Sequence, residues 1–503
     1  MIEIARTRTR ARAESGALVV LVCALVFGWG LVGSPAQGSA EESAPCGPFE
    51  AGDSGIVELA ADRTLRDPGV ERPAEAGGAQ DPGSIVPLPQ AGSAAATDSS
   101  GVTGSPAGLP SASTAPAEPQ APSEALLALP KNAAGAIPSD FELGPGAEIA
   151  HSFFSPVICA TVARITGPPG SSLDQLVTVV PETGIVVPND VYASAADELK
   201  SVPAAQARAA DPYASLQYGL AVSGVRAARD LGAGQGVRVA LLDSAPERDH
   251  ADLAPGGIES LGAAAASRPA VHGTLMAGVI GAAEDNGFGI AGMAPKARIV
   301  SIPICTANAG AGGQCTIYQM LQGFDRAYDA KAAIVNLSLA GPPNPLLERG
   351  VARLDSLGLV VVAAAGNEGS EERRYPAAYP SVIGVGAVDR EGRLFPKSNR
   401  GSWVELHAPG VEVLSTVPGN AFAFGSGTSL AAAHVTGWLA VMTSITGDAK
   451  AARSALFRSV NARASRSLPV MPRICDVLPR VGKQCSAPKA QGVSAPSGGR
   501  ARP

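Results

Sequence analysis

Between residues 211 and 461, short continuous apolar runs alternate with segments in which apolar residues recur at helical spacing. The apolar runs are Val237–Leu242, Ile299–Ile304, Ala332–Leu339, Leu359–Ala365 and Val382–Val388. The helical segments are His272–Ala283, Thr316–Ala330, Pro345–Leu357 and Thr428–Thr443. Continuous apolar strands that alternate with helices are typical of a mostly parallel sheet with helices on both faces. The pattern therefore predicts one large α/β domain over residues 211–462.

A smaller α+β unit is predicted just before this domain. Ile158–Ile165 alternates in strand fashion, and Ser171–Val180 has the spacing of a short helix capped by Ser171 or Ser172. Gly184–Asn189 reads as a strand that ends at a proline. With the Ala-rich connector that follows, this unit spans residues 141–210.

The first 140 residues differ in composition from the rest. Arginines at 6, 8, 10 and 12, an apolar run over 17–33 and small residues at 38–40 predict a signal peptide over residues 1–40. An uncleaved membrane anchor is the alternative. Residues 41–140 are rich in Pro, Gly, Ala and Ser, and we expect a mostly disordered linker there. The basic tail over 463–503 is expected to be mostly flexible.

Composition and cysteine count narrow the class of protein. The net charge of −6 argues against a general nucleic-acid binder. No apolar stretch of about 18 residues follows residue 40, which excludes a polytopic membrane protein. Of the seven cysteines, the close pairs Cys305/Cys315 and Cys475/Cys485 suit local disulfides in an exported chain. The connectivity stays open, since the six cysteines after the signal allow about 15 arrangements.

Four polar residues stand where an α/β fold places its chemistry, at strand ends and helix starts. Asp243 ends an apolar run, His272 opens a helical segment, Asn367 follows a buried run between glycines, and Ser429 precedes an Ala-rich helix. Each has a simpler interpretation: a turn residue for Asp243 and Asn367, a surface histidine for His272, and a helix cap for Ser429. A hydroxyl nucleophile, however, needs a base, and that base needs an orienting carboxylate.

Taken together, the order Asp–His–Asn–Ser resembles the subtilisin-like serine proteases, the subtilase family, over about residues 211–461. The segments Phe424–Gly437, His250–Leu253, Gly289–Pro295 and Asn336–Gly341 carry further similarity. The resemblance implies that Ser429 is the nucleophile, His272 the general base, Asp243 its orienting partner and Asn367 an oxyanion-hole donor. The departures Ala245, Leu275, Ala433 and Ala340 remove none of these groups.

The resemblance also implies where substrate and metal would bind. Substrate would lie as an extended strand beside Ser338, Leu339, Ala340 and Gly341, with a first pocket walled by Ala340 and by Ala364, Ala365 and Gly366. Residues 306–313 would form the other rim. No cofactor is implied for the chemistry. The family's structural calcium sites suggest Asp252, Asp285 and Asn286 as candidate ligands, although a plain surface turn explains them equally well.

These observations lead us to expect an exported serine endopeptidase, secreted or located in the periplasm or cell envelope. It would be monomeric, would act on peptides or proteins, would not bind nucleic acid, and would contact a membrane only through an uncleaved N-terminal segment. Residues 141–195 would act as an inhibitory prodomain, with self-cleavage within Ala193–Ala210 leaving a mature N-terminus near Asp211. The alternatives are a catalytically silent subtilase-like module that binds peptides, or a surface scaffold.

Overall fold

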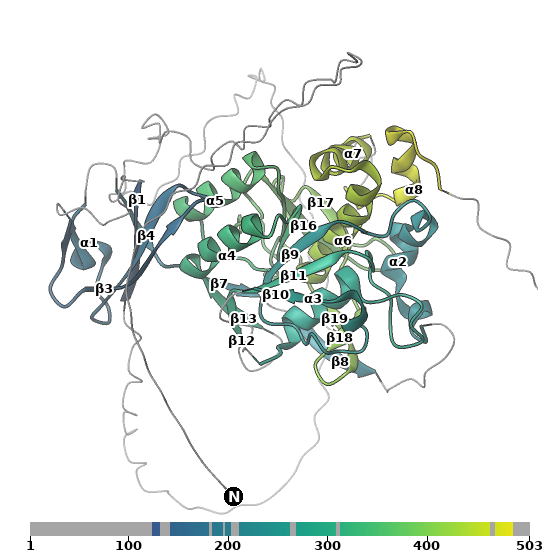
Figure 1. Cartoon of the computed structure of the whole chain (residues 1–503), viewed down its shortest axis with the longest axis horizontal. Coiled ribbons are helices and arrows are strands. Elements are labelled where there is room, and N and C mark those ends of the chain that lie inside the picture. Colours follow the sequence, from purple (N-terminus) through teal and green to yellow (C-terminus); the bar gives the residue numbers. More distant parts are fainter. Residues whose placement is uncertain are drawn as a thin grey trace, which may run out of the picture. The chain divides into compact units, whose positions relative to one another are not determined.

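The computed structural model describes residues 123–130, 141–180, 184–194, 197–202, 211–261, 268–307, 312–462 and 468–485 (Figure 1). The predicted signal peptide, most of the predicted linker and most of the tail lie outside these residues. Every described residue belongs to one compact unit within Pro45–Pro503. Among the described residues no single helix is long and apolar enough to cross a membrane, although the bent pair Thr428–Thr446 and Ala449–Asn461 meets that test jointly.

A seven-stranded sheet forms the centre of the large domain, in the order β10-β11-β9-β14-β15-β16-β17. All its neighbouring strands are parallel, as the apolar runs predict. The strands are β9 Arg238–Asp243, β10 Glu259–Ser260, β11 Arg298–Pro303, β14 Ile334–Leu337, β15 Val360–Ala364, β16 Val382–Val388 and β17 Leu406–Pro409. Parallel strands bring their carboxyl ends to one edge of the sheet, which is where such folds place function.

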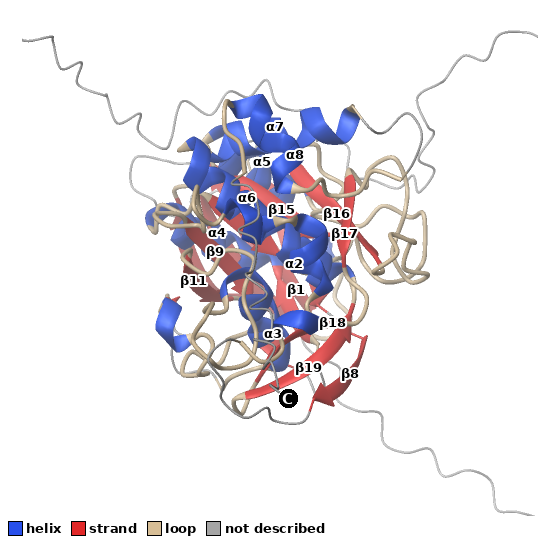
Figure 2. Ribbon diagram, turned by 90° about the vertical axis from the view of Figure 1, so that its right-hand side faces the viewer, coloured by secondary structure: helices blue, strands red, loops and turns tan. Residues whose placement is uncertain are grey.

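Helices cover both faces of this sheet, and two hydrophobic clusters mark the two faces (Figure 2). Along β9, Val239 and Leu241 belong to one cluster, while Ala240 and Leu242 belong to the other. The first face packs against α2 Tyr218–Ser223, α3 Val271–Gly281, α6 Thr428–Thr446 and α7 Ala449–Asn461, and the second against α4 Ile317–Asp329 and α5 Pro345–Ser356. The predicted α/β class is therefore confirmed.

Two small antiparallel sheets flank the large one. The strands β18 Val413–Val417, β19 Ala421–Ser426 and β8 Asp197–Val202 make one of them. The strands β12 Cys305–Ala307, β13 Gly313–Thr316 and β7 Val191–Ser194 make the other. A disulfide between Cys305 and Cys315 links the β12–β13 hairpin, as the spacing of these cysteines predicts.

The N-terminal unit is a four-stranded antiparallel sheet in the order β3-β4-β1-β6. Its elements are β1 Ser123–Pro130, β3 Glu148–Ser155, β4 Ala160–Gly167, β6 Ile185–Pro188, the pair β2 Glu142–Leu143 and β5 Val177–Val179, and the single-turn helix α1 Leu173–Leu176. Only the first part of the predicted helix over 171–180 is therefore helical; the rest is β5.

Strand β1 corrects the prediction that order begins near residue 141. It lies inside the sheet, between β4 and β6, and Ala125, Leu126 and Leu127 are fully buried. The run of five apolar residues at 125–129 is enough to form an inner strand, but it is much shorter than the Pro- and Ala-rich stretch around it. An average over that stretch therefore conceals the strand.

The tail also contains more structure than predicted. Residues 468–485 form α8 Ile474–Val477 and a following 3-10 turn, Leu478–Val481; three further 3-10 turns are Ala214–Leu216, Val225–Ala228 and Ala254–Gly256. Ile474, Val477 and Leu478 are fully buried in the core cluster around α6. The predicted disulfide between Cys475 and Cys485 is present. Burial of three apolar side chains accounts for this order in a polar segment.

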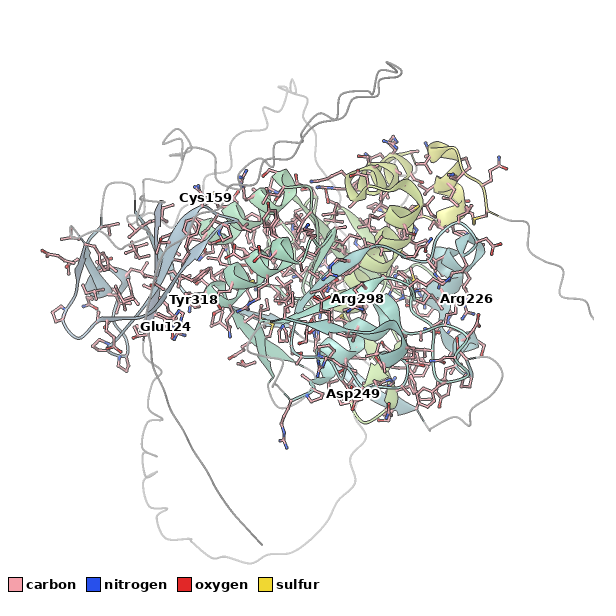
Figure 3. The ribbon with its side chains drawn as sticks, viewed as in Figure 1. Glu124, Cys159, Arg226, Asp249, Arg298 and Tyr318 are labelled. Carbon is pink, nitrogen blue, oxygen red and sulfur yellow. A yellow bond between two sulfur atoms is a disulfide. The ribbon has the colours of Figure 1, made fainter. Side chains whose placement is uncertain are left out.

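The N-terminal sheet packs on α4 through polar contacts. Asp325 Oδ1 accepts hydrogen bonds from Ser155 Oγ (2.7 Å) and from the Val157 N–H (3.1 Å). Tyr318, which lies beside Glu124 and the N-terminal sheet in Figure 3, bonds through its hydroxyl to His151 Nδ1 at 2.6 Å. Asn189 Oδ1 accepts from the Tyr318 N–H at the start of α4. These bonds join the N-terminal sheet to the large domain.

Asp325 makes this interface sensitive to pH. Burial raises the pKa of the Asp325 carboxyl from its ordinary 3.8 to about 6, against the two hydrogen bonds that lower it. Between these two values the folded protein binds more protons than the unfolded chain, so this carboxyl makes stability fall as the pH rises from about 4 to about 6.

We expect Asp325→Asn to remove this dependence, because an amide oxygen keeps both hydrogen bonds and does not titrate. Urea unfolding of the full chain, compared at about pH 4 and about pH 7, tests this. The variant should gain stability relative to its parent as the pH rises. Asp174→Asn, at an exposed position in α1, is the control. An equal pH slope in parent and Asp325→Asn would contradict the expectation.

Candidate active site

Asp243 and His272 form a buried pair at the carboxyl edge of the sheet. Asp243 is the last residue of β9, and His272 is in the first turn of α3. His272 Nδ1 lies 2.8 Å from Asp243 Oδ1 and 2.9 Å from Oδ2, and each residue is 1% exposed. The sequence prediction that these two residues lie together is consistent with this geometry.

Ser244 fixes the carboxylate on its other side. Its N–H and its hydroxyl donate to Asp243 Oδ1 at 2.7 and 3.1 Å, and its hydroxyl oxygen accepts from the Gly273 N–H at 3.1 Å. Ser244 therefore links the end of β9 to the start of α3. A buried carboxylate held by several donors keeps one orientation and can orient an imidazole in turn.

The second ring nitrogen of His272, Nε2, is available to accept a hydrogen bond or a proton. With Nδ1–H donated to the carboxylate, Nε2 carries the lone pair and is the acceptor of the ring. Nε2 is buried and has no hydrogen-bond partner among the described residues. A buried polar atom without a partner is unfavourable unless a reacting group meets it, so this atom marks a functional position.

Ser429 is tied to the strand next to β9. It lies in the first turn of α6, after Gly427, and is 3% exposed. Its Oγ donates to the Ser338 carbonyl at 3.3 Å, and Ser338 Oγ donates to the Ser429 carbonyl at 3.3 Å. Ser338 directly follows β14, which pairs with β9. The start of α6 and the end of β9 thus meet at the same edge of the sheet.

A buried polar chain supports this contact from behind. Asn336 Nδ2 donates to Ser338 Oγ at 2.9 Å, and Thr436 Oγ1 donates to Asn336 Oδ1 at 2.8 Å. Asn336, Ser338 and Thr436 are each 0% exposed. Satisfied buried hydrogen bonds of this kind fix one arrangement of their elements, here α6 on β14.

Asn367 is held beside the same helix start. Its Oδ1 accepts from the Thr428 N–H at 2.9 Å and from Thr428 Oγ1 at 3.0 Å, and the Gly366 N–H donates to Thr428 Oγ1 at 3.0 Å. With the amide oxygen fixed on Thr428, the NH₂ group is turned away from that residue. Gly366 has φ +100°, and a Cβ there would lie 2.5 Å from Asn399 Nδ2, so glycine is needed at this turn.

The residues predicted to bind substrate lie around these groups. Ser338 and Ala365 are fully buried, Leu339 and Ala364 are 2% exposed, and Ala340 is partly exposed. A Cβ at Gly366 would lie 3.5 Å from the Ala340 methyl, so both predicted walls of the first pocket face one space. Gly341 pairs with Tyr375 through two backbone hydrogen bonds. At the rim, Glu368 accepts a hydrogen bond from Asn399 Nδ2.

The three candidate calcium ligands do not fit a cation site. Asp252 accepts from Asn286 Nδ2 (2.9 Å) and from the Ile290 N–H (2.8 Å), so hydrogen-bond donors occupy both carboxylate oxygens. Burial raises the pKa of Asp252 to about 7, which opposes its charge. The backbone N–H groups of Asp285 and Asn286 bind Asp211. Among the described residues no group of three or more His, Cys, Asp or Glu could hold a metal ion.

Four supporting residues are not predicted from the sequence: Ser244, Thr428, Asn336 and Thr436. Ser244 and Thr428 each stand directly beside a predicted catalytic residue, so their position was a usable signal. Asn336 and Thr436 are 100 residues apart along the chain, and no local pattern indicates that they bond.

The comparisons with known proteins agree with this geometry. The model of the Subtilase family matches residues 234–465. Thermitase from Thermoactinomyces vulgaris is 36% identical over 252 residues, which cover 49% of this chain and 89% of thermitase. Subtilisin BL from Lederbergia lenta is 37% identical over 232 residues, covering 45% and 84%. The thermophilic serine proteinase of Bacillus sp. (strain AK1) is 44% identical over 174 residues, or 34% of this chain, and the match spans 42% of that protein. The chain therefore belongs to the subtilase family and is a subtilisin-like serine protease.

Thr428 offers a test of how the Asn367 amide is positioned. Thr428→Val removes the hydroxyl that donates to Asn367 Oδ1, and we expect kcat for peptide hydrolysis to fall about tenfold with little change in KM. Thr428→Ser keeps the hydroxyl and should stay close to wild type. Steady-state kinetics on a peptide substrate measures both values. A Val variant that changes only KM would assign this contact to substrate binding instead.

Proposed function

We propose that this protease is an exported endopeptidase that uses Ser429 as nucleophile, His272 as general base and Asp243 as the residue that orients the base. The observation that carries the proposal is the buried Asp243–His272 pair, in which Nε2 has no partner among the described residues. Asp243 ends β9, and Ser429 bonds to Ser338, which directly follows the neighbouring strand β14. Nε2 makes no hydrogen bond to a described residue that would stabilise the fold. It is suited to accept a proton from a hydroxyl that approaches it.

The reaction follows from these positions. The Ser429 hydroxyl gives up its hydrogen bond to the Ser338 carbonyl and donates to Nε2 of His272 instead. The Ser429 oxygen then attacks the carbonyl carbon of the substrate, and the imidazole takes the hydroxyl proton. Asp243 stabilises the imidazolium through Nδ1. The imidazolium then protonates the leaving amine, and water enters by the same sequence to release the acid.

Asn367 is proposed to stabilise the negative oxygen that develops during attack. Its amide oxygen is held by Thr428, which supports a fixed direction for the NH₂ donor. The N–H of Ser429, at the start of α6, is the proposed second donor. Such donors act because they are in place before the charge develops.

Peptide substrate is proposed to bind as an extended strand along Ser338–Gly341. Main-chain pairing there demands little of the substrate sequence, while the methyl of Ala340 and the wall at 364–366 favour small or apolar side chains in the first pocket. The disulfides Cys305–Cys315 and Cys475–Cys485 support a protein that matures in an oxidising compartment, outside the cytosol. We also propose that the N-terminal unit restrains the enzyme until it is removed.

A silent peptide-binding module is the less favoured alternative. Such a module would have no reason to keep a carboxylate and an imidazole bonded in a dry site, since burial of this pair is costly without a use. The four predicted catalytic residues are all present, and the matched relatives are proteases by name.

Replacing the nucleophile tests the proposal. We expect Ser429→Ala to lower kcat by about a millionfold while the fold is retained, a magnitude known from subtilisin itself. Ser426→Ala, three residues earlier at the end of β19, is the matched control and should retain activity. Peptide hydrolysis and thermal unfolding are measured on both proteins. Activity of Ser429→Ala within about tenfold of the control would refute the role of Ser429.

A further inference from the structure

Asn399 is a fully buried residue that lies against the loop carrying Asn367. This loop, residues 365–370, directly follows β15 and is named the Asn367 loop. Asn399 comes from the segment after β16, the strand that pairs with β15. A buried polar side chain is expected to use its hydrogen-bonding groups, and the side chain of Asn399 uses its own on this one loop.

The side-chain amide of Asn399 makes four hydrogen bonds. Nδ2 donates to the Ala365 carbonyl at 3.0 Å and to Glu368 Oε2 at 2.5 Å. Oδ1 accepts from the N–H of Glu368 at 3.2 Å and from the N–H of Ser370 at 2.9 Å. An amide group has two N–H donors and an oxygen with two lone pairs, so each of its positions is used. Two acceptors face Nδ2 and two donors face Oδ1, so only this orientation of the amide satisfies all four bonds.

These bonds enclose Asn367 on both sides along the chain. Before Asn367, the Ala365 carbonyl accepts from Nδ2, and the Gly366 carbonyl accepts from the backbone N–H of Asn399 at 3.0 Å. After Asn367, two backbone N–H groups of the loop donate to Oδ1. A Cβ at Gly366 would lie 2.5 Å from Asn399 Nδ2, so the amide rests directly on the loop backbone. One residue from outside the loop therefore fixes the main chain that carries Asn367.

Ser398 in turn anchors Asn399 to the central sheet. Ser398 is fully buried, and its hydroxyl donates to the Asn399 carbonyl at 3.1 Å. The same hydroxyl oxygen accepts from the N–H of Ala387, in β16, at 3.1 Å. Because β15 and β16 are neighbouring strands, Asn399 links the loop after one strand to the segment after the other. The position of the Asn367 loop is thus set by the sheet itself.

We infer that Asn399 is the residue that positions Asn367 for its proposed role as an oxyanion-hole donor. This inference rests on the proposed function of Asn367. Thr428 fixes the side-chain oxygen of Asn367, and Asn399 fixes the main chain from which that side chain extends. A donor of this kind is effective because it is in place before the negative charge develops. Asn399 acts through another residue and is therefore a positioning residue.

Steady-state kinetics of Asn399→Ala on a peptide substrate tests the inference. The variant loses the four side-chain bonds and keeps the backbone bond to Gly366, so the loop remains but its position is less fixed. We expect kcat to fall about tenfold while KM stays within about twofold. Leu354→Ala, which removes a fully buried side chain in α5, controls for lost stability and should keep kcat within about twofold of wild type. A change confined to KM would overturn the inference, because Asn399 would then act on substrate binding.

A double-mutant cycle shows whether Asn399 acts through Asn367. Asn367→Ala alone should lower kcat about a hundredfold or more, a magnitude known from subtilisin. With that donor absent there is no amide to position, so adding Asn399→Ala should lower kcat less than about twofold further. An equal loss from Asn399→Ala in both backgrounds would overturn the inference and leave the role of Asn367 standing. Wild-type kcat in Asn367→Ala would instead refute the proposed function of Asn367.

A second variant provides the test if Asn399→Ala does not fold. Asn399→Asp keeps the shape of the side chain and the oxygen that accepts from the loop, but it directs a second carboxylate oxygen at the carboxylate of Glu368. We expect kcat to fall at least about tenfold. Adding Glu368→Gln supplies an NH₂ group that can donate to the new carboxylate, and it should restore kcat at least about threefold relative to Asn399→Asp. A double variant no more active than Asn399→Asp would overturn the inference.

Discussion

The bond between the Asp243 carboxylate and His272 Nδ1 is the interaction on which the site depends. A carboxylate that is 1% exposed is stable only when donors surround it, and His272 and Ser244 supply them. Because Asp243 ends β9 and His272 begins α3, the same contact sets how the helix starts relative to the sheet. The packing of α3 against the sheet therefore also orients His272, the proposed base, and no further structural element is needed for this.

A second, independent set of contacts places Ser429, the proposed nucleophile. Ser338 and Ser429 exchange hydrogen bonds, and Asn336 and Thr436 hold Ser338 from behind. β14 is common to both sets, since it pairs with β9 on one side and anchors α6 through Ser338. The end of β14 also continues as the strand that pairs with β7 at Ala340. β14 thus contacts the elements that carry the proposed base and the proposed nucleophile, and it leads into the proposed substrate strand. This accounts for a site assembled from residues nearly 200 positions apart.

The sequence alone was sufficient where a local pattern carried the information. The apolar runs gave five of the buried strands, and the positions of Asp243, His272, Asn367 and Ser429 at strand ends and helix starts predicted that they gather at one edge. The sequence was insufficient where contacting residues lie far apart along the chain, or where the composition of a long stretch hides a short element. β1 was hidden by the composition around it, and the tail residues Ile474 and Leu478 gave no periodic signal. The structure gives no support to the calcium hypothesis, because the NH₂ group of Asn286, and not its oxygen, faces Asp252. No sequence motif indicates which way a side-chain amide points.

The most direct test of the account is to identify the residue that reacts with a fluorophosphonate, which labels a serine only when a neighbouring base activates it. If Ser429 is the nucleophile, mass spectrometry of the labelled protein finds the phosphonate on Ser429, and prior denaturation abolishes labelling. Labelling of another serine, or no labelling of a preparation that hydrolyses peptides, would contradict the assignment of Ser429 and of the His272 base that activates it.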